Sequence, residues 1–213
     1  MQLATTLGAR TLNRHAAREQ ETDLALLERI AREDRRAVAE LYARHQRPLF
    51  RYLCQLTPDH GLAEEILQDT IVAVWQGAAS FEGRSAVRTW LFAIARRQAH
   101  NVLRRRGQPL ADEDALEALE DSDPGPEERV LKQSDAHEVQ RAIARLPLIH
   151  REVLVLNFVN GLRYDEISAV LGVPEGTVKS RLSNAKRGLR RLIHDARPAG
   201  DSSARSIVQG AHE

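Results

Sequence analysis

Apolar residues recur along the chain at the three- and four-residue spacing that is typical of amphipathic helices. In the segment LAEEILQDTIVAVWQ, Ile66, Thr70 and Val74 fall on one helical face. An α-helix has about 3.6 residues per turn, so this spacing aligns side chains that can be buried together. No stretch alternates apolar and polar residues as a half-buried β-strand does. The pattern therefore predicts an all-α fold.

Turn and cap residues mark where these helices are expected to begin and end. Pro48 indicates a helix start or a kink, because proline lacks the N–H that a helix interior requires. The segment TPDHG at 57–61 predicts a turn before a helix over 62–76. Ser85 is expected to cap a helix over 86–106, since its hydroxyl can accept a hydrogen bond from a first-turn N–H.

A change in composition divides the 213 residues into two helical blocks. Residues 111–128 contain nine acidic residues and no basic ones, and prolines stand at 109, 124 and 126. Such a segment is typical of a flexible linker, so two small helical domains are expected. The expected segments are a mobile tail at 1–21, a first domain at 22–106, an acidic linker at 107–133, a second domain at 134–195 and a mobile tail at 196–213.

Basic residues gather on both sides of the acidic segment. Residues 84–106 hold seven basic residues and no acidic one, and residues 163–197 hold eight basic and four acidic residues. The formal net charge of the whole chain is only +1. The distribution therefore indicates two separate polyanion-binding surfaces rather than a uniformly basic protein.

Several functional classes find no support in the sequence. Cys54 is the single cysteine, so no disulfide can form within the chain and a reducing compartment is favoured. The histidines show no metal-ligand spacing, and neither a nucleophile motif nor a phosphate-binding glycine loop is present. No apolar run is long enough to span a membrane. We therefore expect a cytoplasmic protein that is not an enzyme, inserts into no membrane and requires no cofactor or metal.

The segment VPEGTVKSRLSNAKRGLRRLI, at 173–193, predicts a helix with one narrow apolar stripe. The stripe consists of Val178, Leu182, Ala185, Leu189 and Leu192. The preceding YDEISAVLG supplies a short amphipathic helix and a glycine turn, so the two together predict a helix-turn-helix whose second helix enters the major groove of DNA. The alternative is a solvated charged face on an ordinary core helix. The candidate DNA-binding residues are Thr177, Lys179, Ser180, Arg181, Ser183, Asn184, Arg187 and Arg191.

Three long segments resemble the extracytoplasmic-function (ECF) group of bacterial RNA polymerase sigma factors. They are LYARHQRPLFRYLCQLTPDHGLAEEILQDTIVAVW, SFEGRSAVRTWLFAIARRQAHNVLRRR and LPLIHREVLVLNFVNGLRYDEISAVLGVPEGTVKSRLSNAKRGLRRLI. The resemblance covers residues 22–106 and 134–195. It implies a helical sigma domain two that reads and melts the −10 promoter element, and a sigma domain four that reads the −35 element. The implied partners are core RNA polymerase, through its β′ and β subunits, promoter DNA and an anti-sigma factor.

The resemblance also assigns roles to particular residues of the first domain. AEEILQDT is similar to the helix that docks on the polymerase β′ coiled coil, with Glu65, Gln68 and Asp69 at its polar positions. The −10 element would be bound by Phe81, Arg84, Ser85, Arg88, Trp90, Arg97, His100, Asn101 and Arg104, with Arg96 on the same polar side of the helix. For Phe81 and Trp90, core packing is the alternative to contact with unpaired bases.

The sequence departs from the commoner family pattern at four positions. In the family, the position of Arg97 is commonly Asn, the position of Asn101 is commonly Asp, and the position of Asn184 is frequently Arg or His. An unusual promoter preference is therefore expected. Arg163 replaces a frequent serine ahead of the helix-turn-helix. Losing such an N-cap costs about 1 kcal/mol unless Asp165 or another group replaces it.

Two questions stay open from the sequence. A stand-alone helix-turn-helix regulator, which binds duplex DNA without polymerase, would explain the second block but not the first. The acidic linker is either a solubilising spacer or, as the resemblance implies, a polyanion mimic that occupies the nucleic-acid channels of the polymerase.

Overall fold

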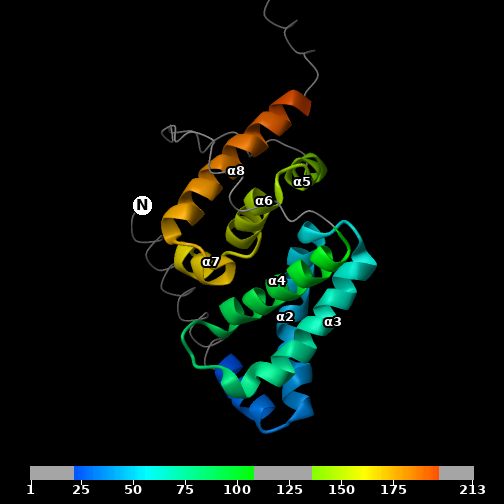
Figure 1. The fold of residues 1–213 in the computed structure, drawn as a ribbon, viewed down its shortest axis with the longest axis vertical. Helices are drawn as coiled ribbons and strands as arrows, with labels where there is room; N and C mark the ends of the chain where they lie inside the picture. Colours follow the sequence, from blue (N-terminus) through cyan, green and yellow to red (C-terminus); the bar gives the residue numbers. More distant parts are fainter. Residues whose placement is uncertain (1–21, 108–135, 197–213) are drawn as a thin grey trace, which may run out of the picture.

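The computed structural model describes residues 22–107 and 136–196, in which all regular structure is helical (Figure 1). The elements are a helix at 22–31, α2 (Arg35–Leu56), α3 (His60–Gly77), the 3₁₀ turn η1 (Ala78–Ser80), α4 (Val87–Arg105), α5 (Ala136–Ala144), α6 (Leu148–Leu154), the π-helical turn η4 (Val155–Val159), α7 (Tyr164–Leu171) and α8 (Glu175–Ala196). The prediction of an all-α protein with two helical domains is confirmed. The expected tails and nearly all of the acidic linker lie outside the described residues.

The first domain packs the helix at 22–31 and α2, α3 and α4 around an aliphatic core. The face predicted for α3 is buried, with Ile66, Thr70 and Val74 all fully inaccessible to solvent. Thr70 satisfies its hydroxyl inside the core by donating to the carbonyl oxygen of Ile66 at 2.7 Å. A buried hydroxyl needs such a partner, so this threonine fits among apolar neighbours.

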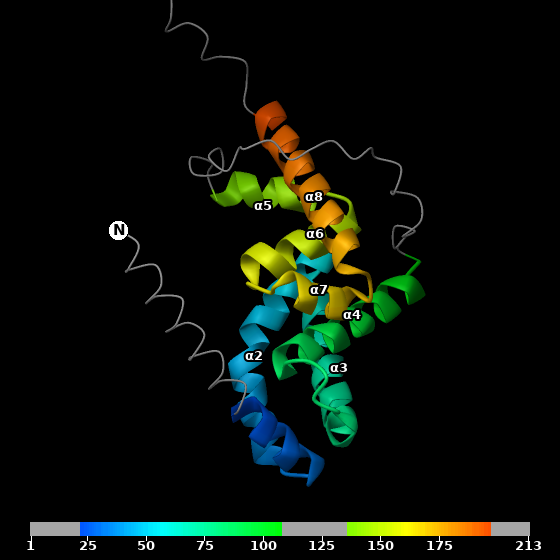
Figure 2. The same cartoon turned by 90° about the vertical axis from the view of Figure 1, so that its left-hand side faces the viewer.

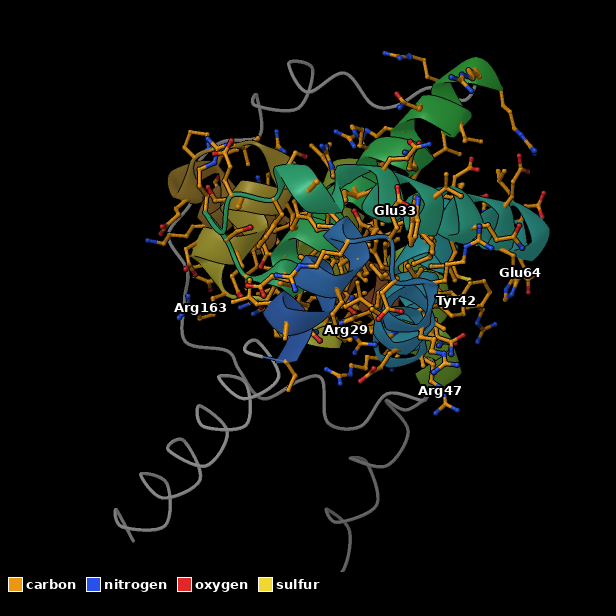
Figure 3. All side chains as sticks on the ribbon, turned by 90° about the horizontal axis from the view of Figure 1, so that it is seen from below. Arg29, Glu33, Tyr42, Arg47, Glu64 and Arg163 are labelled. Carbon is orange, nitrogen blue, oxygen red and sulfur yellow. The ribbon has the colours of Figure 1, made fainter. Side chains whose placement is uncertain are left out.

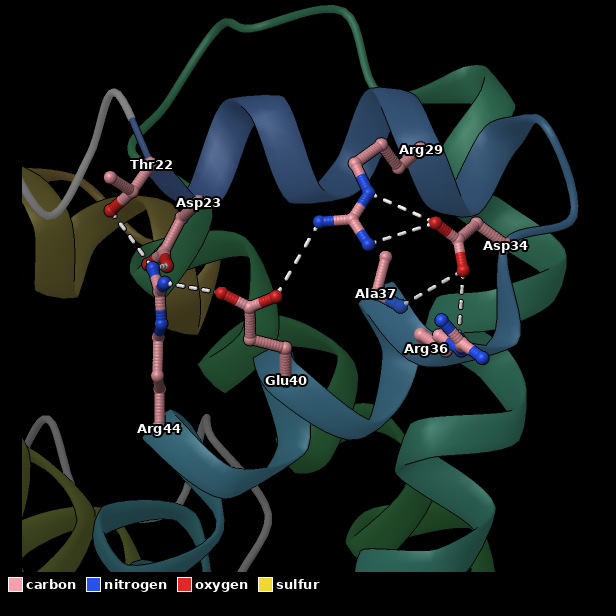
Figure 4. Close-up of polar contacts among 8 residues, drawn as sticks. All are labelled: Thr22, Asp23, Arg29, Asp34, Arg36, Ala37, Glu40 and Arg44. Atoms are coloured by element: carbon pink, nitrogen blue, oxygen red, sulfur yellow. Dashed lines mark hydrogen bonds and ion pairs between the residues drawn. The ribbon is translucent and has the colours of Figure 1, made fainter.

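A chain of polar contacts joins the helix at 22–31 to α2 (Figure 4). Arg29 pairs with Asp34 at 2.9 Å and with Glu40 at 3.4 Å, and Arg44 pairs with Glu40 at 2.9 Å and with Asp23 at 3.1 Å. Asp34 also caps α2, and its hydrogen bond with Arg29 holds its pKa below the ordinary value. Exposed ion pairs each contribute little, so the apolar face of this hairpin supplies most of its stability.

Of the two alternatives for Pro48, the helix start is wrong, and two further boundaries differ from the sequence-based expectation. Pro48 lies inside the continuous helix α2 rather than at its start, because buried Leu49, Tyr52 and Leu53 hold the following turn against the core. Helix α3 begins at His60, inside the expected turn, because the side chain of Asp59 accepts a hydrogen bond from the Leu62 N–H at 3.1 Å.

The expected Ser85 cap is also wrong. The N-cap of α4 is Ala86, which makes no capping side-chain hydrogen bond. Ser85 instead donates its hydroxyl to the Ala86 carbonyl oxygen at 3.4 Å. Helix α4 is anchored mainly by its apolar face, where Val87, Leu91 and Leu103 are buried.

The second domain packs α5, α6 and α7 against the long helix α8. Of the predicted stripe on α8, Val178, Leu182, Ala185 and Leu189 are buried, while Leu192 is only half-buried and Ile193 completes the face. A Cβ atom added to Gly188 would lie 3.0 Å from Leu146 Cδ2, so glycine allows close approach at this point of α8.

The two domains pack against each other in this structure. Helix α4 lies along α7, and α2 contacts α6, which agrees with the two perpendicular views (Figures 1 and 2). Within residues 22–107 and 136–196, no helix combines the length and apolar character needed to cross a bilayer. The domain contact brings the polar side of α4 against the second domain.

Candidate nucleic-acid interface

Helices α7 and α8 form the predicted helix-turn-helix. Gly172 ends α7 with φ of 72°, a left-handed conformation that glycine adopts without steric cost, and its N–H donates to the Ser168 carbonyl oxygen at 2.9 Å. The Ser168 hydroxyl donates to the Val173 carbonyl oxygen at 2.7 Å and so closes the turn. The turn directs α8 across α7 with its apolar stripe inward.

Glu166 forms one half of a capping box at the start of α7, where the serine that would form the other half is missing. The backbone N–H of Arg163 donates to Glu166 Oε2 at 2.8 Å, which satisfies one of the donors at the helix start. Arg163 itself has no side-chain acceptor, and its guanidinium instead pairs with Asp165. Glu166 therefore stabilises the start of α7, while Arg163 offers no side-chain acceptor to the first-turn N–H groups.

Most of the predicted −35 residues lie on the outer side of α8. Lys179, Ser180 and Arg191 are exposed, and Thr177, Ser183, Asn184 and Arg187 are half-exposed. Arg187 Nη2 donates to Asn184 Oδ1 at 3.2 Å, so the guanidinium and the amide form one polar unit. A paired Asn and Arg on an exposed helix face can contact a base edge and a neighbouring phosphate together.

Arg181 is the exception, because it is only 9% exposed. Burial lowers the pKa of His150 below its ordinary value, and the nearby positive charge of Arg181 lowers it further. Arg181 thus belongs to the inner flank of α8, away from the exposed basic face. The helical-wheel position alone does not reveal this, since α6 supplies the covering residues.

The predicted polymerase-docking residues lie together on the solvent side of α3. Glu65, Gln68 and Asp69 are exposed, and Glu65 pairs with Arg106 at 3.4 Å. Figure 3 shows Glu64, a further acid of α3, at the opposite edge of the molecule from Arg163 of the helix-turn-helix. In this view, the acidic face of α3 and the start of α7 therefore lie at opposite edges.

The two aromatic candidates of the −10 region pack against each other. The rings of Phe81 and Trp90 have centroids 5.1 Å apart, and both side chains are half-buried against the core. A Cβ on Gly77 would lie 3.4 Å from the Trp90 ring, so this indole also covers the end of α3. Both residues therefore support the core while leaving part of each side chain accessible.

The polar candidates of the −10 region divide into two groups. Arg84, Arg97 and Arg104 are exposed, and Ser85 and Asn101 are half-exposed. The other group, Arg88 and His100, is half-buried and hydrogen-bonds to the second domain.

A buried carboxylate at the domain contact was not foreseen from the sequence. Glu152 on α6 is 1% exposed, and its Oε1 lies 3.1 Å from the Tyr52 hydroxyl, 3.0 Å from Arg96 Nε and 3.0 Å from His100 Nε2. Burial would raise the pKa of Glu152, but the hydrogen bond from His100 and the charge of Arg96 lower this pKa below its ordinary value. Burial, with the nearby Glu152 charge, raises the pKa of Tyr52 well above its ordinary value. The only sign of this buried carboxylate in the sequence is that Glu152 is the single acid in the largely apolar segment LIHREVLVL.

Solved structures share this arrangement of helices. CnrH, determined in complex with the cytosolic domain of CnrY, has a TM-score of 0.62 and 23% identity, over 82% of this chain and 99% of that one. The sigma factor RpoE from Bartonella quintana, determined with the anti-sigma factor NepR, has a TM-score of 0.57 and 28% identity, over 75% of this chain and 98% of that one.

Two helical domains, the second with a helix-turn-helix and an exposed basic face, are typical of a DNA-binding protein. The family model described as Sigma-70 region 2 matches residues 41–108, and that described as Sigma-70, region 4 matches residues 136–189. The ECF RNA polymerase sigma-E factor of Escherichia coli (strain K12) is 33% identical over 180 residues, which covers 80% of this chain and 94% of that protein. The RNA polymerase sigma-H factor of Pseudomonas aeruginosa is 30% identical over 184 residues, which covers 82% and 95%. The chain belongs to the ECF group of RNA polymerase sigma factors.

This membership decides between the two functions that the sequence left open. A stand-alone regulator is not favoured, because the first helical block matches sigma region 2 rather than an unrelated domain.

Proposed function

We propose that this sigma factor docks on core polymerase through α3, reads the −10 element with α4 and reads the −35 element with α8. The observation that carries the proposal is the exposed basic face of α8, oriented by the left-handed turn at Gly172. In this proposal the protein acts in the cytoplasm as a non-catalytic factor. Its domains extend over 22–106 and 134–195, with residues 107–133 as the linker.

Run-off transcription tests this function directly. The purified chain alone is expected to bind promoter duplex weakly, and with bacterial core polymerase to yield transcripts from discrete start sites. The promoter is obtained by mapping transcript starts after overproduction of the protein. Tight specific duplex binding by the chain alone, with no transcription after core is added, would contradict the proposal.

Docking through α3 predicts a specific loss in Asp69→Ala. Asp69 is exposed on the acidic face of α3, where a basic partner helix on the β′ subunit would pair with its carboxylate. A hydrogen bond between charged groups contributes about 1.5–3 kcal/mol, so affinity for core should fall about tenfold or more. Fluorescence anisotropy of labelled sigma factor titrated with core measures this affinity.

Glu28→Ala is the matched control for the docking experiment. Glu28 is also an exposed acid of the first domain, but it lies on the helix at 22–31. The Glu28→Ala variant should bind core polymerase with the same affinity as the unmodified protein. Equal affinities for Asp69→Ala and Glu28→Ala would place the docking surface elsewhere.

Regulation by an anti-sigma factor is the remaining part of the proposal. RpoE from Bartonella quintana was determined in complex with the anti-sigma factor NepR. In this chain, Val72, Phe158 and Val159 are large apolar side chains that are 54%, 56% and 44% exposed among the described residues. Exposed apolar side chains of this size are suited to contact with a protein partner.

A further inference from the structure

The polar side of α4 is covered along part of its length by the second domain. The Arg88 guanidinium donates to the Asn160 carbonyl oxygen at the end of η4. Two turns further along α4, Arg96 Nη1 donates to the Leu171 carbonyl oxygen at 3.4 Å. Basic side chains suited to DNA phosphates are therefore engaged by backbone carbonyls within the same chain.

Glu152 is the centre of this contact. All three groups that hydrogen-bond its Oε1, from Tyr52, Arg96 and His100, belong to the first domain. The carboxylate therefore points out of the second domain into the first. It occupies, with its negative charge, the place at Arg96 and His100 where a phosphate would bind.

Two residues with backbone or side-chain bonds across the contact also hold buried polar atoms without a hydrogen-bond partner in the described part of the chain. Arg151 donates across the contact to the Gln55 carbonyl oxygen at 2.9 Å, yet its Nε is buried without a hydrogen-bond partner among the described residues, as is Asn160 Oδ1. An unsatisfied buried polar atom is destabilising, so it lowers the stability of the closed arrangement. This feature favours a contact that can open over a permanent core.

The docking face of α3 stays open while the polar side of α4 is partly covered. Glu65, Gln68 and Asp69 are exposed in the same structure in which His100 contacts Glu152. Polymerase can therefore engage α3 before the domains separate.

We propose that the contact of Glu152 with Tyr52, Arg96 and His100 is an autoinhibitory lock that covers the part of the −10 surface of α4 around Arg88, Arg96 and His100 until the domains separate. The inference rests on the proposed role of α4 at the −10 element. In the closed protein, the carboxylate excludes nucleic acid from Arg96 and His100. When the domains separate, promoter DNA replaces the Glu152 carboxylate at Arg96 and His100.

Charge reversal at Glu152 tests the lock. Dyes at cysteines replacing the exposed Glu64 and Glu175, in a Cys54→Ser background, report the distance between the domains by single-molecule energy transfer. Glu152→Lys places a cation against Arg96 and His100, which should raise the ratio of separated to compact molecules about a hundredfold or more. The unmodified protein should show one compact population, and the variant a broader one with lower transfer.

Binding of a short fluorescein-labelled oligothymidylate at low salt reports access to α4. Glu152→Lys should bind it at least about tenfold more tightly than Glu28→Lys, which makes the same change of net charge on an exposed helix. Lower transfer together with tighter binding supports the lock.

Two results would overturn the proposed lock, and a third would require the same assays on a milder variant. Unchanged energy transfer with retained helicity overturns the lock, as does separation without tighter oligothymidylate binding than Glu28→Lys. If Glu152→Lys loses helical circular dichroism, the isosteric Glu152→Gln decides in the same two assays. Failure of the proposed function would appear separately, as absence of run-off transcription by the unmodified protein with core polymerase.

Discussion

Replacing Phe92 with alanine is expected to lower the free energy of unfolding of the first domain by about 3–5 kcal/mol. The Phe92 ring is 1% exposed and stands edge-on to Tyr52, with centroids 5.4 Å apart and an interplanar angle of 78°. Arg88 lies over the same ring at 5.8 Å. The substitution therefore leaves a cavity and removes support from Tyr52 and from the domain contact. Total stabilities are about 5–15 kcal/mol, so transcription should be strongly reduced at physiological temperature.

Urea denaturation followed by circular dichroism measures this loss, with Phe158→Ala as the matched control. Phe158 is 56% exposed, and its main partner is the Lys186 ammonium, 5.1 Å from the ring centroid. The same deletion of an aromatic ring should cost less than about 1 kcal/mol there. Equal destabilisation by the two variants would show that Phe92 is not a core support.

Removing three basic side chains from α8 is expected to weaken promoter binding by at least about a hundredfold. Lys179 and Arg191 are exposed, and Arg187 is half-exposed beside Asn184 on the same face. If each contacts a phosphate, the triple alanine variant releases about three fewer counterions. The slope of log affinity against log salt should then become shallower by about 2.7, at about 0.9 per phosphate.

The control for this variant removes the same charge from a distant surface. Arg32, Arg36 and Arg47 are exposed on the first domain, and Arg47 lies at its outer edge (Figure 3). Their triple alanine variant should leave the salt slope of holoenzyme binding to the mapped promoter nearly unchanged. Equal slopes for the two triple variants would mean that long-range charge, rather than contact by α8, controls binding.

The features that the sequence predicted well are those encoded within a few turns of one helix. The stripe of Val178, Leu182 and Ala185 follows from helical periodicity, because apolar side chains at this spacing can be buried only on one side. Gly172 marks the turn for an equally local reason, since a left-handed backbone disfavours other residues. The roles of particular side chains toward polymerase and promoter stay predictions.

The errors occurred where a neighbouring element overrides a local preference. Pro48 should disfavour a helix interior, but burial of Leu49 and Leu53 stabilises α2 around it. Ser85 has the chemistry of a cap, yet the path of the loop turns its hydroxyl toward a carbonyl oxygen. Arg181 is a surface cation by its wheel position, but it is buried on the side of α8 where its charge acts on His150 of α6.

The sequence by itself determined the helical class, the apolar faces, the turn of the helix-turn-helix and the resemblance to ECF sigma factors. Only the tertiary structure decided that Glu152 meets Tyr52, 100 residues away along the chain, and that Arg96 and His100 are turned toward the second domain. Periodicity reports which side of a helix is buried but carries no information on which distant helix covers it. The partner of a buried charge depends on that packing, and so does whether the −10 surface is open or closed.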